Sequence, residues 1–190
     1  GRQLWTFGTD WHHETLGQTS NGVNELNTSG NAKRSSTEVF VQNNVLLSED
    51  FELLFGLRGQ KDSDFGSHWA PKVGLRANVW NGAEWQGVLR ASIGQGYRVP
   101  NLKERHYLFD HSALGYRVIG NPGLKPESST SLQLGATFKR GERLSVDVNA
   151  FYNRLRDLIQ IDEARATVTD GIANYTYANV ARARTTGVDT

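Results

Sequence analysis

Long stretches in which every second residue is apolar are the feature that most limits how this chain can fold. In the stretch from Trp85 to Tyr97, Leu89 and Ile93 share one parity and Arg90 has the other. The same alternation runs through residues 51–61, 69–80, 132–139 and 144–153. A period of two belongs to a strand with one apolar and one polar face, whereas a helix would repeat every 3.6 residues. Weaker strands over residues 2–14, 35–48 and 173–190 bring the prediction to about eight strands.

The connections between these strands alternate in length. Short turns are expected at residues 47–51, 80–84 and 139–143, and longer loops at about 15–34, 62–68, 98–128 and 161–172. In an antiparallel meander, odd and even connections emerge at opposite ends of the sheet. One end therefore carries tight turns and the other carries long loops, which is typical of outer-membrane barrels.

The two faces of the predicted strands leave two interpretations open. Trp69, Trp85 and Tyr97 lie at the ends of uncharged apolar stripes, where outer-membrane barrels carry girdles of aromatic side chains. A soluble sandwich would instead bury the same apolar face as its core. Sandwich strands usually have about 5–6 residues and these have about 11–15, which favours a membrane barrel.

Composition excludes several other classes of protein. The chain has no cysteine, so it can hold neither a disulfide nor a zinc–thiolate site. A net charge of +1 without a basic run argues against nucleic acid as a partner. No nucleophile elbow, zinc-binding helix motif or phosphate loop is present, so we expect neither an enzyme nor a resident cofactor. The chain starts without a signal peptide or an initiator methionine, and we expect it to be an internal piece of a longer protein.

Two short boxes resemble a known family. The stretch "GYRVPNLKE" followed by "GNPGLKPESS" resembles the paired boxes that flank one extracellular loop in TonB-dependent outer-membrane receptors. The resemblance continues into the neighbouring strands and covers roughly residues 35–189. It implies an all-β antiparallel meander of about eight long strands, part of a 22-stranded transmembrane β-barrel. Residues 1–190 would then be a partial barrel domain, with the plug domain and the remaining strands absent.

The resemblance also implies a function and partners. An intact receptor of this family lies in the outer membrane of a Gram-negative bacterium and takes up a metal chelate, most readily a ferric siderophore. Energy would come from the TonB protein through the missing plug, and the lipid membrane would surround the barrel. Haem is the alternative substrate. A structural or interaction β-domain without a transport role is the alternative from a different class.

Candidate ligand-binding residues come from the loop between the boxes, which is rich in cationic and aromatic side chains. They are Arg98, Arg105, His106, Tyr107, His111, Tyr116 and Arg117. Arg98 either pairs with Glu104 or Glu127 or faces the ligand. No metal site is expected unless haem is the ligand, in which case His106 or His111 is a candidate for the iron. We also expect an open curved sheet whose edges pair with other copies or with another chain.

Overall fold

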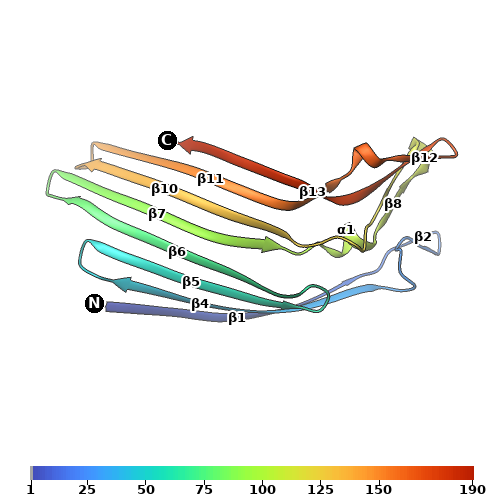
Figure 1. Ribbon diagram of the computed structural model, residues 1–190, viewed down its shortest axis with the longest axis horizontal. Coiled ribbons are helices and arrows are strands. Elements are labelled where there is room, and N and C mark those ends of the chain that lie inside the picture. The colour runs from blue at the N-terminus through green and yellow to red at the C-terminus, as the bar shows by residue number, and fades with distance from the viewer. Residues whose placement is uncertain (1) are drawn as a thin grey trace.

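The computed structural model describes residues 2–190, apart from the side chain of Ala181. One curved antiparallel sheet dominates it (Figure 1). Its long strands are β1 (Arg2–Leu16), β4 (Ala32–Leu46), β5 (Phe51–Asp62), β6 (Gly66–Asn81), β7 (Trp85–Arg98), β10 (Glu127–Arg140), β11 (Leu144–Ile161) and β13 (Ile172–Asp189). These eight long strands confirm the number and the places predicted from the alternation. Among the described residues, no helix is long and apolar enough to cross a membrane.

The long strands pair in the order in which they follow along the chain. The order is β1-β4-β5-β6-β7-β10-β11-β13, and every neighbouring pair is antiparallel. No pairing joins β1 to β13 within residues 2–190, so this part of the barrel is an open sheet. The predicted meander and its openness are therefore confirmed. The expectation that the edges pair with other copies stays a prediction.

Short turns gather at one end of the sheet and long connections at the other (Figure 1). The smaller elements belong to the long connections. They are β2 (Thr19–Ser20), β3 (Val23–Asn24), α1 (Leu102–His106), β8 (Leu108–His111), η1 (Ser112–Leu114), β9 (Tyr116–Ile119), η2 (Glu163–Arg165) and β12 (Thr167–Thr169). We call the end with these elements the loop end.

The predicted long loop over residues 62–68 is wrong. Strands β5 and β6 extend to Asp62 and Gly66, so only three residues connect them. The Asp62 side chain accepts hydrogen bonds from the backbone N–H groups of Asp64, at 2.9 Å, and Phe65, at 3.2 Å. Gly66 follows at φ +72°, a conformation that glycine adopts without strain. These local bonds favour a tight turn where the sequence suggested a loop.

The sheet has a polar face and an apolar face, as the alternation predicted. Cross-strand register places Val73 opposite Ile93 on the apolar face, and Arg76 opposite Arg90 on the polar face. Large apolar side chains of the first set are exposed rather than covered by a second layer, with Trp69 62% and Ile93 52% exposed. A sandwich would bury them, so the soluble alternative does not fit this sheet.

A small apolar core lies at the loop end instead of between sheets. Leu26 from the β3–β4 connection packs with Ala32 of β4 and with Leu102 of α1. Leu16 and Tyr107 pack against this group. The core therefore joins the connection that follows β1 to the one that follows β7, and it gives both a fixed position above the sheet.

Candidate ligand-binding groove

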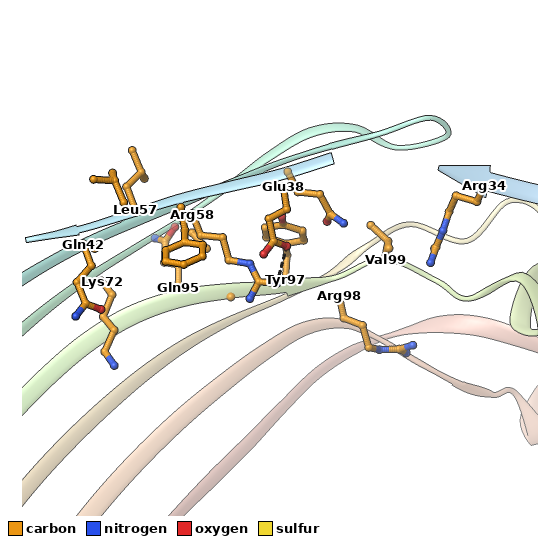
Figure 2. A pocket seen from close by; sticks show the side chains of 16 residues that line it. Arg34, Glu38, Gln42, Leu57, Arg58, Lys72, Gln95, Tyr97, Arg98 and Val99 are labelled. Atoms are coloured by element: carbon orange, nitrogen blue, oxygen red, sulfur yellow. Dashed lines mark hydrogen bonds and ion pairs between the residues drawn. The ribbon is translucent and has the colours of Figure 1, made fainter. Parts of the chain in front are cut away.

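A groove of about 670 Å³ lies on the polar face towards the loop end. Figure 2 shows side chains from β4 to β7 that line it, with Glu38, Arg58 and Lys72 among those labelled. Basic groups outnumber acidic ones around the groove. Its lining suits an anionic ligand better than a cationic one.

Lys72 is the cation of this groove that is best placed to meet a ligand. Its neighbours across the strands are Gly56 of β5 and Gly94 of β7. Neither glycine has a side chain to cover the lysine stem, which lies 3.4 Å from the position that a Cβ atom on Gly94 would occupy. In the described part of the chain the Lys72 ammonium forms no ion pair with a carboxylate. Its charge is therefore free to act on the groove.

Positive charge continues along the polar face below the groove. A second hollow of about 290 Å³ is lined by Lys72, Arg76, Arg90 and Glu52, together with uncharged residues that are both polar and apolar. Arg90 donates to Asp147 at 3.0 Å and to Thr137 at 2.8 Å. Arg58 donates to Glu38 at 2.5 Å. These two arginines are thus partly neutralised, whereas neither Lys72 nor Arg76 pairs with a carboxylate among residues 2–190.

Arg34 ties the sheet to the turn after β7. Its side chain is 8% exposed, and its guanidinium donates to the Pro100 carbonyl oxygen at 2.5 Å and to a Glu14 carboxylate oxygen at 2.7 Å. Asp62 lies 3.7 Å away on its other side. Pro100 itself is fully buried. The start of the loop between the two boxes is thereby fixed against β1, β4 and β5.

Arg98 pairs with both of the carboxylates that the sequence offered it. It donates to the two oxygens of Glu127 at 2.7 and 2.8 Å, and to Glu104 at 3.0 Å. Glu104 also completes a reciprocal cap of α1 with Asn101. This bidentate arrangement favours a structural role for Arg98, since its donors are directed at protein acceptors.

The other two candidate arginines also have carboxylate partners. Arg105 pairs with Asp64, and its guanidinium lies 4.9 Å from the centre of the Phe65 ring. Arg117 pairs with Asp110 at 3.2 Å and donates to the Ser112 hydroxyl at 3.0 Å. Hydrogen bonds from the Ser112 side chain and backbone lower the pKa of Asp110, and Arg117 lowers it further. Both arginines hold the loop in shape.

Aromatic rings form a continuous row along β8 and β9. The ring of Phe109 lies 5.9 Å from that of Tyr107 and 4.2 Å from that of His111. Tyr116 stacks on the other side of His111 at 5.2 Å. Aromatic faces of this kind can stack on a ring-bearing ligand. The row brings together three of the candidates, Tyr107, His111 and Tyr116.

His106 lies apart from this row. Its Nδ1 is 2.9 Å from the side-chain oxygen of Asn27. Burial lowers the pKa of His106, and the nearby charge of Arg105 lowers it further, so the imidazole is neutral at pH 7. Within residues 2–190, no group of three or more His, Asp or Glu side chains is arranged to hold a metal ion.

Tyr97 does not belong to an aromatic girdle, which corrects the sequence prediction. Pairing between β6 and β7 ends at Lys72 and Gly94, so the two strands separate towards the loop end. The Tyr97 ring lies against the His68 ring of β6, with their centres 4.9 Å apart and their planes tilted by 31°, and it lines the groove (Figure 2). An unpaired stretch of strand lets a side chain lie between the strands instead of following the alternation.

Two residues that matter for the groove were missed from the sequence. Lys72 is one polar position among many in the alternation, and only its pairing with two glycines marks it out. Arg34 lies in a weakly alternating strand, and its partners Glu14, Asp62 and Pro100 are distant in the chain. No local signal could have found Arg34.

Comparison with known proteins gives a consistent result. The family model described as TonB dependent receptor-like, beta-barrel matches residues 1–190. The iron-regulated outer membrane virulence protein of Vibrio cholerae is 31% identical over 160 residues, which are 84% of this chain and 24% of that protein. The ferrienterobactin receptor of Escherichia coli is 26% identical over 182 residues, covering 83% of this chain and 24% of that protein. The chain thus spans about a quarter of the length of these relatives.

A solved structure supports the same assignment. The siderophore receptor PirA from Pseudomonas aeruginosa superposes with a TM-score of 0.77 at 26% identity, over 98% of this chain and 32% of that one. The paired boxes, the meander of long strands and the match along the whole chain agree. The chain belongs to the TonB-dependent receptor β-barrel family of the bacterial outer membrane.

Proposed function

We propose that the protein containing this chain takes up an anionic ferric siderophore across the outer membrane. The observation that carries this proposal is the groove on the polar face, which is lined by Lys72 and adjoins a loop held by ion pairs; the Lys72 ammonium pairs with no carboxylate among residues 2–190. Preorganised cationic groups bind an anion without the cost of ordering them first. The names of the Escherichia coli and Pseudomonas aeruginosa relatives support the same class of ligand.

The candidate loop residues keep a place in this proposal. The ring faces of Tyr107, His111 and Tyr116 would stack on a ring-bearing chelate above the groove. Arg98, Arg105 and Arg117 would hold the loop through their carboxylate partners and add to the positive potential that attracts the ligand. His106 would contribute through its bond to Asn27, which joins the two long connections.

The remaining parts of the proposal concern the whole protein. A plug domain and further strands would complete the barrel that residues 1–190 begin. TonB would deliver energy through that plug. Both belong to the proposal because this chain spans only about a quarter of its relatives.

Uptake of radiolabelled ferric enterobactin by a receptor-deleted strain tests the proposal. The strain carries the full-length protein, either unchanged or with Lys72→Gln. Losing one charge-assisted contact costs about 1.5–3 kcal/mol, so the uptake affinity should fall roughly ten- to a hundredfold. Lys61→Gln is the matched control, because Lys61 lies on the opposite face of the neighbouring strand β5. Equal uptake by both variants would mean that the groove does not bind this ligand.

Haem is tested in the same strain. If haem were the substrate, His106→Ala or His111→Ala would abolish growth on haem as the iron source and leave growth on ferric enterobactin intact. Normal growth of both variants on haem would remove the histidines as iron ligands. The side-chain bond of His106 to Asn27 and the stacking of His111 between two rings favour the siderophore.

A further inference from the structure

Strands β6 and β7 separate towards the loop end, while the strands on either side of them stay paired. The pairing of β6 with β7 ends at Lys72 and Gly94. In contrast, β5 is paired with β6 to the last residue of β5, and β10 is paired with β7 to the last residue of β7. Pro71, the next residue of β6, has no N–H with which to continue a ladder. We call the unpaired stretch, residues 67–71 of β6 and 95–98 of β7, the seam.

A contact between β4 and the chain after β7 accounts for the seam. Arg34 of β4 donates to the Pro100 carbonyl oxygen at 2.5 Å, and Figure 2 shows its side chain directed at the chain beside Val99. In the sheet, β5 and β6 lie between β4 and β7. Three strand spacings amount to about 14 Å, which is more than an arginine side chain can span. The chain that follows Gly94 therefore leans out of the line of the sheet towards β4.

Arg34 is itself held in place by two carboxylates. It donates to a Glu14 oxygen at 2.7 Å, and its Nε lies 3.7 Å from Asp62, whose side chain is fully buried. A guanidinium presents several N–H donors in a rigid fork, so one side chain can hold Glu14 and Pro100 together. Because Arg34 is only 8% exposed, its position is set before any ligand arrives.

The seam is not held open by favourable contacts of its own. The Tyr97 hydroxyl and the Nδ1 of His68 are both buried there, and neither has a hydrogen-bond partner among the described residues. Leaving buried polar atoms without partners is unfavourable. A contact outside the seam must compensate, and the bond from Arg34 to Pro100 is placed to do so.

The open seam gives the ligand groove its width. Residues 95–99 line the groove on one side, and Ala70 of β6 lines it as well. The register of the paired part, extended by two residues, would place Ala70 directly opposite Gly96. A closed ladder would bring the two strands to about 4.8 Å from each other and return residues 95–99 to the wall of the barrel. The groove would then lose one of its sides.

We propose that Arg34 is a positioning residue for the ligand groove. By holding the Pro100 carbonyl oxygen, it keeps β7 apart from β6 along the seam and so keeps residues 95–99 at the side of the groove. Its own donors are directed at protein acceptors, so it acts through the backbone of β7. The effect on ligand binding rests on the proposed function, whereas the effect on the seam does not.

Disulfide cross-linking of the full-length protein tests the seam directly. Ala70→Cys and Gly96→Cys place thiols that can bridge only if their Cα atoms come within about 7 Å, as they would in a closed ladder. Residues 1–190 contain no other cysteine. The nearest neighbour of a Cβ atom on Gly96 is the Ser129 hydroxyl, which can rotate away. Gly74→Cys with Ser92→Cys is the control pair, because these residues are register partners in the paired part.

Arg34→Lys is the deciding variant, since it keeps a positive charge beside the buried carboxylates but loses the fork. Well below the unfolding temperature, the cysteine pair in the seam should cross-link roughly tenfold faster in Arg34→Lys than with Arg34 in place. The control pair should cross-link at one rate in both. Arg140→Lys, at the other end of the sheet, is the matched exchange and should leave both rates unchanged. A loss of stability without faster cross-linking in the seam would overturn the proposal.

Binding of ferric enterobactin to the same full-length proteins without the added cysteines tests the second step. A protein whose groove is open for only part of the time binds more weakly by that fraction, so Arg34→Lys should raise the dissociation constant roughly tenfold. Faster cross-linking with unchanged binding would refute the positioning role. If the unchanged protein does not bind ferric enterobactin, the proposed function fails, and the cross-linking rates still decide whether Arg34 holds the seam open.

Discussion

The guanidinium of Arg105 pairs with the carboxylate of Asp64, and this contact joins the loop after β7 to the turn between β5 and β6. Arg105 is 12% exposed and Asp64 25%, so water screens the pair only in part. Phe65 lies under the guanidinium at 4.9 Å. The loop is thereby attached to a turn that is far from it in sequence.

Asp64→Asn should release this attachment. The neutral amide loses the charge-assisted bond, which is worth about 1.5 kcal/mol or more, so amide hydrogen exchange in residues 101–120 should become roughly tenfold faster. Asp170→Asn in the turn before β13 is the control and should leave that exchange unchanged. If Asp64→Asn leaves exchange in residues 101–120 unaltered, the pair does not hold the loop.

Acid should weaken the same contact. Burial raises the pKa of Asp64, but hydrogen bonds from Arg105 and Ser63 outweigh it and lower the pKa below its ordinary value of 3.8. A depressed pKa means that the folded state binds the proton less readily than the unfolded one. The stabilisation is therefore complete well above pH 3.8 and is lost as the pH falls through the lowered value. Exchange in residues 101–120, corrected for its intrinsic pH dependence, should rise only below that pH, and Asp64→Asn should abolish the rise.

The two faces of β7 predict opposite tolerance to charge. Leu89→Arg places a cation on the apolar face and should destabilise the full-length barrel in bilayers by about 2–4 kcal/mol near the midplane. Ser92→Arg places the same side chain on the polar face, where Ser92 lines a hollow, and should cost much less. Urea titration of the refolded protein in bilayers measures both. Equal losses would show that the faces are assigned the wrong way round.

Regular pairing explains which features the sequence could predict. Strands β5, β7 and β10 alternate over most of their length, with Leu54 and Val88 as exceptions, so their places and faces follow from local pattern. Tyr97 escaped prediction because β6 leaves β7 before reaching it. The parallel pairing of β9 with β13 joins residues 116–119 to residues 173–176, and no local pattern specifies it. The pairing of Arg98 was foreseeable, because both of its partners lie in the two boxes.

Glu127 should contribute far more to stability than a comparable carboxylate at the turn end. It accepts from Arg98 at 2.7 Å and from the Ile159 backbone N–H at 2.7 Å, and it is 8% exposed. Glu127→Gln should therefore cost about 1–3 kcal/mol. Glu84 accepts from Arg140 at 2.6 Å, but both side chains are more than half exposed, so Glu84→Gln should cost about 0–1 kcal/mol. Urea titration of both variants gives the comparison, and equal costs would contradict the role of burial.

The Tyr97 hydroxyl offers a last test of how the separated strands are filled. This hydroxyl is buried and has no hydrogen-bond partner among the described residues, while the ring packs against His68 at a tilt. A buried polar group without a partner costs about 1–3 kcal/mol, so Tyr97→Phe should keep the ring contact with His68 and leave the barrel equally stable or more stable. Tyr97→Ala should destabilise the barrel by at most about 3–5 kcal/mol, because removing the half-buried ring leaves a gap. Thermal unfolding of the full-length protein measures both. A clear loss with Tyr97→Phe would show that the hydroxyl bonds to a group outside residues 2–190, such as the plug or the ligand.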